Sequence, residues 1–214
     1  MPVQQPRARL RQQRILRAAA AVFARRGYGD AAVAEIAREA ETSKGGLYFH
    51  FPGKEALLLA LLDHTAGLLR GKVQTAMAAQ ADPVARAEAA LQVLLRTFSR
   101  HRTLARVFVL EAAAAGPRFQ ARVDAIEQEF AALVRTELDL AVASGRLVPQ
   151  DTDLAAQAWI GMLDGVIRHW VSSRDRNSLE SRYEALHALL LRSVGAWPAP
   201  AGAGAATARK GISA

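Results

Sequence analysis

The feature that most limits the fold is the spacing of apolar residues, which has the period of an α-helix through nearly the whole chain. Runs of Ala, Leu, Arg and Glu are separated by short breaks, and neither an Asn-Gly hairpin signal nor an alternating Val/Ile/Thr block interrupts them. The chain has 214 residues, of which 51% are hydrophobic, so it can bury a substantial core and is not a disordered chain. We therefore expect an all-α fold.

Capping residues and glycine or proline breaks set the expected helix boundaries. Ser43 and Asp82 are natural N-caps, and Gly27 and Gly145 follow helices as stop signals. In the first helix, Ile15 begins an apolar stripe at i, i+3, i+4, i+7 and i+8. The predicted helices cover residues 9–26, 33–40, 44–50, 54–79, 82–100, 104–115, 118–144, 151–172 and 178–196.

Positive charge is concentrated at the N-terminal end. Residues 1–54 contain ten basic and four acidic residues, a net +6, whereas the whole chain, with 28 Lys+Arg and 20 Asp+Glu, has a net charge of only +8. Such asymmetry is expected when one end of a protein contacts a polyanion, so nucleic acid, either DNA or RNA, is the leading partner. An Arg-rich composition that reflects a high-GC genome is the alternative.

Two short helices joined by a tight turn lie within this basic segment. They form a helix-turn-helix pattern, in which the second helix (residues 44–50, the recognition helix) lies in the major groove. Leu47 and Phe51 would anchor this helix to Val33, Ile36 and Phe23, leaving its other side chains toward DNA. The candidate DNA-binding residues are Ser43, Lys44, Gly45, Gly46, Tyr48, Phe49, His50 and Lys54.

Two adjacent glycines in so short a helix need an explanation. Each costs roughly 1 kcal/mol relative to Ala, and a close approach to DNA would account for Gly45 and Gly46. A loop before a short turn, with Tyr48 and His50 as ordinary half-buried residues, is the alternative.

The spacing of these residues resembles the signature of the tetracycline-repressor (TetR) family of bacterial transcription regulators. The matching pattern is Val33-x-x-Ile36-Ala37-x-x-Ala40-x-x-Ser43-Lys44-Gly45-x-Leu47-Tyr48-x-His50-Phe51-x-x-Lys54-x-x-Leu57. The resemblance implies an N-terminal DNA-binding domain (9–53), a linker helix (54–79) and a helical ligand-binding and dimerisation domain (80–196). We expect a flexible arm at residues 1–8 and a disordered tail at 197–214.

The resemblance also implies particular contacts. Lys44 and Gly45 would approach base edges, Tyr48 and His50 would contact phosphates, and Lys54 would add a phosphate contact at a helix N-terminus. The chain departs from the family pattern in two places. Ala31-Ala32 replaces a capping Thr, so that Asp30 is the remaining candidate cap, and Glu41 stands where the turn usually has Gly.

The second half of the chain has apolar and aromatic residues that would line a cavity or, equally, form a dry core. Two acids, Glu111 and Asp164, lie in apolar surroundings where a charge needs a partner; they either contact a ligand, pair with an Arg or face solvent. The candidate ligand-binding residues are Phe98, Leu104, Phe108, Glu111, Phe119, Val123, Ile126, Phe130, Trp159, Met162, Leu163, Val166 and Trp170.

Several segments resemble the fatty acyl-coenzyme A-responsive branch of the family. They are Phe108-Val-Leu-Glu111, Pro117-Arg-Phe119, Gly145-Arg-Leu, Asp153-Leu, Gly161-x-x-x-Gly165 and Trp170-Val171. The resemblance implies an acyl-CoA effector, with its chain in an apolar tunnel and Arg102, Arg106 or Arg122 near its phosphates. The alternative effector is a lipophilic drug or aromatic compound that controls an efflux gene.

A small-residue stripe, Ala158, Gly161 and Gly165, indicates close helix packing, and with the last helix it is the candidate homodimer interface. The leucines of that last helix, Leu179, Leu186, Leu189 and Leu190, with Val194, would otherwise close the monomer core. Ligand binding among residues 104–143 would shift the linker helix and change the separation of two recognition helices on a palindromic operator, the usual result being release of a repressor.

The sequence gives no sign of catalysis. Cysteine is absent, the five histidines have no metal-ligand spacing, and no phosphate-cradling loop or nucleophile elbow occurs. We expect no enzyme activity, no cofactor and no metal; a helical enzyme or scaffold with a basic arm is the alternative class. With no apolar segment after the polar start and no run of roughly 18 apolar residues, we expect a cytoplasmic protein with no membrane partner.

Overall fold

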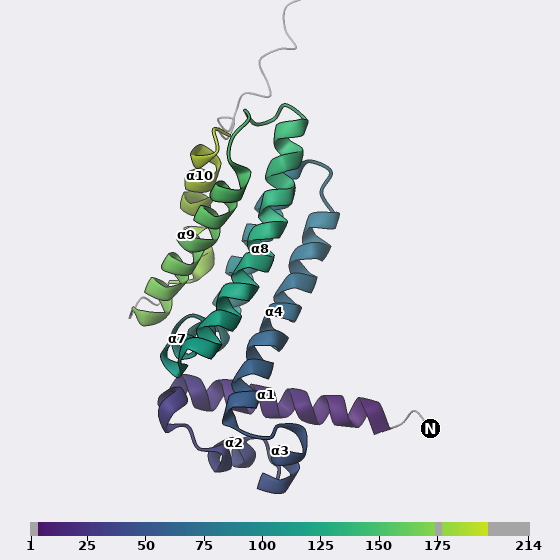
Figure 1. The fold of residues 1–214 in the computed structure, drawn as a ribbon, viewed down its shortest axis with the longest axis vertical. Helices are drawn as coiled ribbons and strands as arrows, with labels where there is room; N and C mark the ends of the chain where they lie inside the picture. Colours follow the sequence, from purple (N-terminus) through teal and green to yellow (C-terminus); the bar gives the residue numbers. More distant parts are fainter. Residues whose placement is uncertain (1–3, 174–176, 197–214) are drawn as a thin grey trace, which may run out of the picture.

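The computed structural model describes residues 4–173 and 177–196, and within these ranges every regular element is helical. Figure 1 shows a small domain at one end, in which α1 (Gln4–Asp30) lies across the long axis with α2 (Val33–Glu39) and α3 (Lys44–His50) beneath it. The remaining helices run along the long axis away from this domain. The prediction of an all-α fold is confirmed.

Helix α1 begins before its predicted start. Residues 4–8, which the sequence assigned to the flexible arm, already belong to α1, whose first turn tolerates Pro6 because the N–H groups there have no intrahelical partner. At the other end Gly27, with φ 79°, interrupts the helix where the sequence predicts its stop. The first residues of the arm and the predicted tail at 197–214 lie outside the described part of the chain.

Helix α2 has no side-chain cap at its N-terminus. Its N-cap is Ala32, and no side chain accepts a hydrogen bond from the first N–H groups. The expectation that Asp30 caps this helix is wrong, because Asp30 is the last residue of α1 rather than the residue next to Val33. The first turn of α2 therefore depends on packing, with Ile36 and Ala37 buried beneath it.

The turn between α2 and α3 is a Schellman motif built around Glu41. The Thr42 N–H bonds the Ala37 carbonyl at 3.0 Å, and the Glu41 N–H bonds the Arg38 carbonyl at 3.1 Å. The sequence left two alternatives for Glu41, a left-handed conformation or a different kind of turn, and its φ of 49° shows the first. This conformation directs the chain from α2 into the recognition helix.

Four long helices form the body of the second domain: α4 (Lys54–Ala78), α5 (Pro83–Arg100), α8 (Pro117–Ala143) and α9 (Thr152–Ser172). Helix α4 starts in the small domain and continues into this body, which makes it the physical link between the two (Figure 1). The predicted last helix instead consists of a 3₁₀ turn (Leu179–Arg182) and α10 (Tyr183–Ser193), and Gly195 with φ 75° follows its end.

The predicted helix at 104–115 is longer and irregular. It consists of α6 (Arg102–Arg106), a π-helical turn (Val107–Glu111) and α7 (Ala112–Ala115). π turns insert an extra residue into a helix and often occur at functional sites. Here the turn lies directly above α1.

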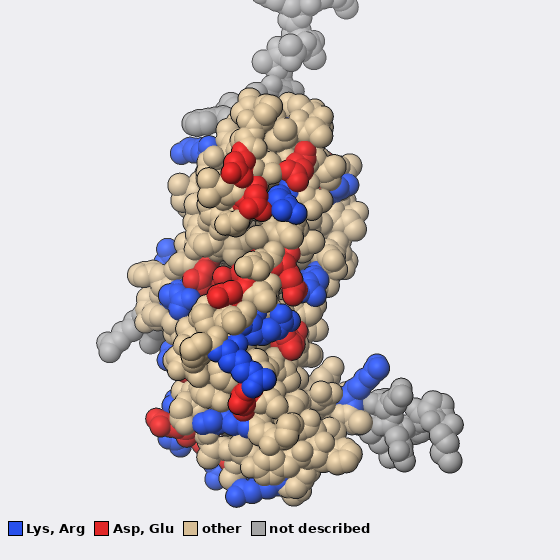
Figure 2. Space-filling view, in the orientation of Figure 1, with Lys and Arg blue, Asp and Glu red and all other residues tan. Residues whose placement is uncertain are grey.

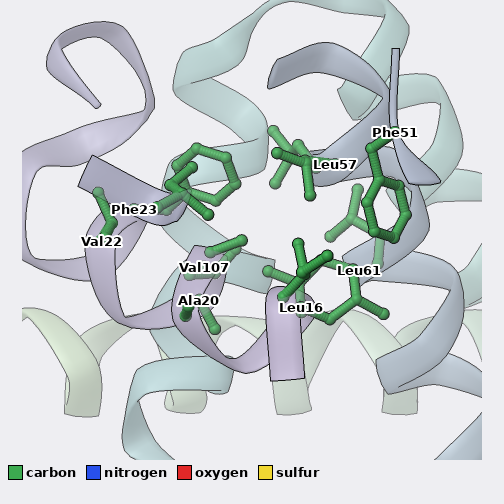
Figure 3. Packing of buried hydrophobic residues seen from close by; sticks show 14 of the residues in the cluster. Leu16, Ala20, Val22, Phe23, Phe51, Leu57, Leu61 and Val107 are labelled. Atoms are coloured by element: carbon green, nitrogen blue, oxygen red, sulfur yellow. The ribbon is translucent and has the colours of Figure 1, made fainter. Parts of the chain in front are cut away.

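The apolar core of the small domain continues into the larger one. Phe23, Leu47 and Phe51 pack with Leu57 and Leu61 of α4 and with Val107 of the π turn. Figure 3 shows the side chains of Phe23, Phe51, Leu57, Leu61 and Val107 converging. A second core lies between α4, α5, α8, α9 and α10 and includes Trp159 and Trp170. The first core therefore crosses the domain boundary and packs α4 and the π turn against the small domain.

Among the described residues, no helix is both long and apolar enough to cross a membrane.

Candidate nucleic-acid interface and ligand cavity

The recognition helix turns one side inward and the other outward. Leu47 is fully buried, whereas Tyr48 is 49% and Phe49 is 85% exposed. Lys44 and Gly45 are also exposed, and His50 is half-buried. An exposed aromatic pair beside a lysine and a glycine is the kind of surface that contacts a groove and its phosphates. The predicted anchoring by Leu47 and Phe51 is confirmed.

The two glycines of this helix have different surroundings. Ser43 Oγ accepts a hydrogen bond from the Gly46 N–H at 3.0 Å, which confirms Ser43 as the N-cap. A Cβ added to Gly46 would lie 2.6 Å from Thr42 Oγ1, so packing against the turn already accounts for this glycine. A Cβ on Gly45 would meet nothing closer than 3.9 Å. A close approach to DNA therefore stays a prediction for Gly45, and Gly46 does not require it.

Lys54 has a structural contact that the sequence did not indicate. Its Nζ donates hydrogen bonds to the carbonyls of Tyr28 and Gly29, both at 2.8 Å, and lies 4.7 Å from the centre of the Tyr28 ring. The ammonium group thus fixes the start of α4 to the end of α1. Its phosphate contact stays a prediction, and the third N–H of the ammonium group would have to make it.

Part of the basic charge of the small domain is neutralised internally. Arg25 Nη2 donates to Glu35 and Glu39 at 3.0 Å each, and this hydrogen bond holds the pKa of Glu35 below its usual value. Arg14 lies 3.9 Å from the Glu41 carboxylate. Most charged side chains visible at the lower end of Figure 2 are nevertheless basic. The surface around the recognition helix therefore keeps the sign that DNA binding requires.

Replacing Glu41 by glycine should both stabilise the protein and strengthen DNA binding. Glycine removes a left-handed strain of about 1–2 kcal/mol and an exposed negative charge beside the recognition helix. A gain of about 1 kcal/mol would raise the midpoint of thermal unfolding by about 2–4 °C. Glu41→Ala is the control, because it removes the charge and keeps the strain. An unchanged or lower melting temperature for Glu41→Gly would contradict the proposed strain.

Two apolar cavities lie between α4, α5, α8 and α9. The lower cavity, nearer the small domain, has a volume of about 60 Å³, and the upper cavity about 50 Å³. They adjoin, because Leu94, Phe130, Ile160 and Leu163 line both. Together they form a narrow, elongated apolar chamber, and a ligand that enters it would have to move these helices apart.

About half of the predicted ligand-binding residues line this chamber. Phe98, Phe108, Ile126, Phe130, Trp159 and Leu163 face one or both cavities. The others do not line either cavity, and they are Leu104, Glu111, Phe119, Val123, Met162, Val166 and Trp170. Phe119 and Val123 instead belong to the core shared with the small domain, whereas Trp170 is buried in the second core.

The arginines expected near a phosphate group have partners within the protein. Arg102 Nη2 donates to the Trp170 and Ser173 carbonyls and its guanidinium lies 4.4 Å from the centre of the Trp170 ring. Arg122 Nε donates to Asp63 at 2.6 Å. Arg106 Nε lies 3.5 Å from Glu111 Oε1. These side chains stabilise helix ends and helix contacts in the described structure.

Glu111 connects the two domains. Its Oε2 accepts a hydrogen bond from the Tyr28 N–H at 3.1 Å, and the side chain is buried. The Tyr28 ring packs against Phe119, with the ring centres 5.2 Å apart. In the same π turn Phe108 and Val109 line the lower cavity. This one π-helical turn thus lines the cavity and also contacts α1. Glu111, for which the sequence predicted a partner, has two: the backbone N–H of Tyr28 and the guanidinium group of Arg106.

Replacing Glu111 by alanine should destabilise the protein by about 1–3 kcal/mol, because the Tyr28 N–H loses its acceptor and the Arg106 guanidinium loses its ion-pair partner. Glu111→Gln keeps an acceptor for the Tyr28 N–H and should lose less. Urea unfolding of the two variants and the parent protein measures the difference. Equal stability of all three would show that the contact contributes nothing.

The sequence missed the contribution of α4 to the chamber. Thr65, Ala66 and Leu69 line the lower cavity, and Val73 and Met77 line the upper one. Their i, i+4 spacing was visible, but it is also the spacing of a helix that simply packs on its neighbours. The sequence also did not indicate Glu127, which lines the lower cavity. Asp164, noted as an acid in apolar surroundings, lines the same cavity. It pairs with Arg168, whose Nη2 lies 3.1 Å from both carboxylate oxygens of Asp164.

The candidate dimer surface is only partly available. Ala158, Gly161 and Gly165 are exposed along α9, with Leu154 62% exposed at the end of the same stripe. On the last helix Leu189 is 54% exposed, whereas Leu179, Leu186, Leu190 and Val194 are buried within the monomer. The alternative that those four residues close the monomer core is therefore confirmed.

A three-helix unit with an exposed recognition helix, joined by one continuous helix to a chamber-bearing helical domain, defines a ligand-responsive helix-turn-helix regulator. The model for "Bacterial regulatory proteins, tetR family" matches residues 15–61, and the model for "Tetracyclin repressor-like, C-terminal domain" matches residues 80–194, more than half of the chain. The chain belongs to the tetR family of bacterial regulatory proteins. The sequence-based family assignment is confirmed.

Sequence matches to curated relatives are mainly short. The chain is 48% identical over 50 residues to the uncharacterized HTH-type transcriptional regulator YuxN of Bacillus subtilis, which is 23% of this chain and 17% of that protein. The first such relatives are each covered over less than a quarter of their length.

Similar solved structures extend over most of the chain. The fatty acid degradation regulator FadR from Bacillus halodurans has a TM-score of 0.79 and 26% identity, covering 84% of this chain and 97% of that one. The transcriptional regulator FadR from Bacillus subtilis, solved in complex with stearoyl-CoA, has a TM-score of 0.79 and 22% identity, covering 87% and 99%. The second likeness is one of fold alone.

Proposed function

We propose that this protein binds a palindromic operator as a homodimer and leaves it when a ligand with a long apolar chain occupies the chamber. The observation that carries the proposal is that α4 forms one wall of both cavities and also begins at the small domain. A ligand in the chamber therefore touches the helix that positions the recognition helix. No intervening element has to transmit the effect.

The ligand that best fits is a fatty acyl-CoA. The chamber is elongated and its lining is almost wholly apolar, which suits an acyl chain, and the B. subtilis FadR with the same fold was solved with stearoyl-CoA. The partners of Arg102, Arg106 and Arg122 argue against a deep phosphate site made by these three residues. The nucleotide part of the ligand would therefore lie outside the chamber.

A dimer supports this mechanism because two recognition helices must enter successive major grooves, about 34 Å apart, on one face of DNA. The exposed small-residue stripe on α9 and the exposed Leu189 offer a surface for a second copy. The dimer can hold its two recognition helices at the separation that fits DNA or at another one. A ligand that binds more tightly to the second arrangement shifts the population away from the DNA-binding one. The protein would act in the cytoplasm and by binding alone, without catalysis.

Fluorescence anisotropy with a labelled fragment of the protein's own promoter region tests the proposal. The purified protein is titrated at several salt concentrations, with and without lauroyl-CoA. We expect salt-sensitive binding, which is the mark of phosphate contacts, and its loss when lauroyl-CoA is added. Binding that lauroyl-CoA leaves unchanged would exclude this effector class, and the absence of specific binding would exclude the regulator.

A further inference from the structure

Glu127 of α8 lies where the chamber opens to the surface. It lines the lower cavity and also an outer groove between α8 and α9, and Ile160 is shared by the same two spaces. The outer groove encloses about 1040 Å³ including open solvent. It is lined by Asp124, Glu127, Gln128, Ala131, Ala132, Arg135, Asp153, Gln157, Ile160 and Gly161.

The surroundings of Glu127 are acidic. Asp124 precedes it by three residues on α8, and Asp164 faces it from α9. The nearby cations are engaged, because Arg168 of α9 donates to Asp164 and Arg135 donates to Asp153 at 3.2 Å. The residues that α4 and α5 contribute to the lower cavity are all uncharged. Figure 2 shows acidic side chains on this face of the larger domain, interspersed with basic ones.

This setting favours the protonated form of the Glu127 carboxyl group. Burial, and then the charges of Asp164 and Asp124, raise the pKa of Glu127 to about 7, although Arg168 acts in the opposite direction. Near neutral pH a large share of the molecules therefore carry a proton on this carboxyl group. A protonated carboxyl group donates a hydrogen bond, which a carboxylate cannot do.

A fatty acyl thioester or amide and a free fatty acid would place different chemical groups beside Glu127. A thioester or amide carbonyl is neutral and accepts a hydrogen bond, so it complements a protonated carboxyl group. The carboxylate of a free fatty acid would bring a further negative charge beside Asp164 and Asp124 in partly desolvated surroundings. Beyond Glu127, the groove offers the neutral amides of Gln128 and Gln157 next to small residues, which suits an uncharged arm containing amides.

We propose that Glu127 is the residue by which this protein distinguishes the neutral thioester or amide carbonyl of an acyl derivative from the carboxylate of a free fatty acid. Its carboxyl group holds the carbonyl of the ligand at the junction of the lower cavity and the outer groove, and the surrounding acids exclude carboxylates. This inference rests on the proposed function, since it assigns the polar end of the ligand whose chain fills the chamber.

Isothermal titration calorimetry of the full chain with four 12-carbon probes tests the inference. The probes are lauroyl-CoA, lauroyl-pantetheine, laurate and dodecylamine, titrated at about pH 6, 7 and 8.5, a range that spans the titration of Glu127. Lauroyl-pantetheine separates the carbonyl contact from any contact with the CoA phosphates. Operator release by each probe is measured in parallel by anisotropy.

We expect both thioesters to bind at least about tenfold more tightly than laurate at pH 7. Because the protonated form of Glu127 is the donor, thioester affinity should fall as pH rises through about 7, by up to about tenfold per pH unit. Glu127→Gln keeps an N–H donor and cannot ionise. In this variant thioester affinity should be independent of pH, and laurate should bind several-fold more tightly at pH 8.5 than it does to the parent protein.

Asp139→Asn is the matched control, because Asp139 is an exposed acid of the same helix that lines none of the three spaces; it should behave as the parent protein does. Laurate binding as tightly as lauroyl-pantetheine, dodecylamine binding most tightly, or a pH dependence that persists in Glu127→Gln would each overturn the inference. If any one of these results is obtained while the probes still release operator, the inference about Glu127 is wrong and the proposed function is kept. If no probe binds, the inference and the proposed effector class are both wrong.

Discussion

Replacing Lys44 or Tyr48 by alanine is expected to weaken operator binding by between about fivefold and 150-fold for each substitution, equivalent to about 1–3 kcal/mol. Both side chains are exposed on the recognition helix, so neither substitution should affect folding. The two losses should differ in kind. Loss of a base contact by Lys44 should relax sequence specificity, whereas loss of a phosphate contact by Tyr48 should weaken binding to all sequences alike.

Competition anisotropy with operator variants measures both effects. Lys72→Ala is the matched control for charge, because Lys72 is an exposed lysine of α4 away from the recognition helix, and it should leave specificity unchanged. Full operator affinity in both Lys44→Ala and Tyr48→Ala would place the DNA contact elsewhere on the molecule.

Replacing Leu94 by tryptophan should give a protein that binds operator but no longer responds to ligand. Leu94 is half-buried and lines both cavities, so a larger side chain occupies the space where they join. We expect lauroyl-CoA affinity to fall on the order of 100-fold, at a stability cost of about 1–3 kcal/mol for the extra volume. Operator affinity without ligand should be that of the parent protein, because an indole on α5 fills only the junction of the two cavities and does not extend along α4 as a ligand chain would.

Calorimetry for the ligand and anisotropy for the operator test this variant together. Leu140→Trp makes the same exchange at a partly exposed position of α8 that lines neither cavity, and should bind lauroyl-CoA normally. If Leu94→Trp still releases operator at ordinary lauroyl-CoA concentrations, the ligand does not use this chamber.

Local signals in the sequence predicted local features of the structure. Ser43 and Asp82 cap the helices that they were expected to cap, since an N-cap depends on residues within one turn. Glu41 adopts the left-handed conformation, one of the two alternatives that the sequence left open, because the two hydrogen bonds that end α2 need a residue with positive φ at this position. The helix order and the recognition helix were accessible for the same reason.

Contacts between distant residues could not be predicted in this way. Glu111 accepts from the N–H of Tyr28, 83 residues earlier, and Lys54 donates to the carbonyl of the same residue, 26 residues earlier. Neither partner leaves a sequence pattern. Similarly, Phe98 and Trp170 look alike as apolar aromatics in amphipathic helices, but of the two only Phe98 lines the chamber, whereas Trp170 is buried in the second core. Whether an apolar residue faces space or another side chain depends on how four helices pack, which their periodicity does not contain.

We expect a ligand in the chamber to displace α4 and thereby to change the separation of the two recognition helices of a dimer. Since the chain contains no cysteine, a nitroxide attached to Phe49→Cys places one spin label on the exposed side of each recognition helix of a dimer. Pulsed electron paramagnetic resonance measures the distance between the two labels. We predict a shift of that distance by several ångströms when lauroyl-CoA is added. An unchanged distance at a ligand concentration that calorimetry shows to be saturating would contradict the claim.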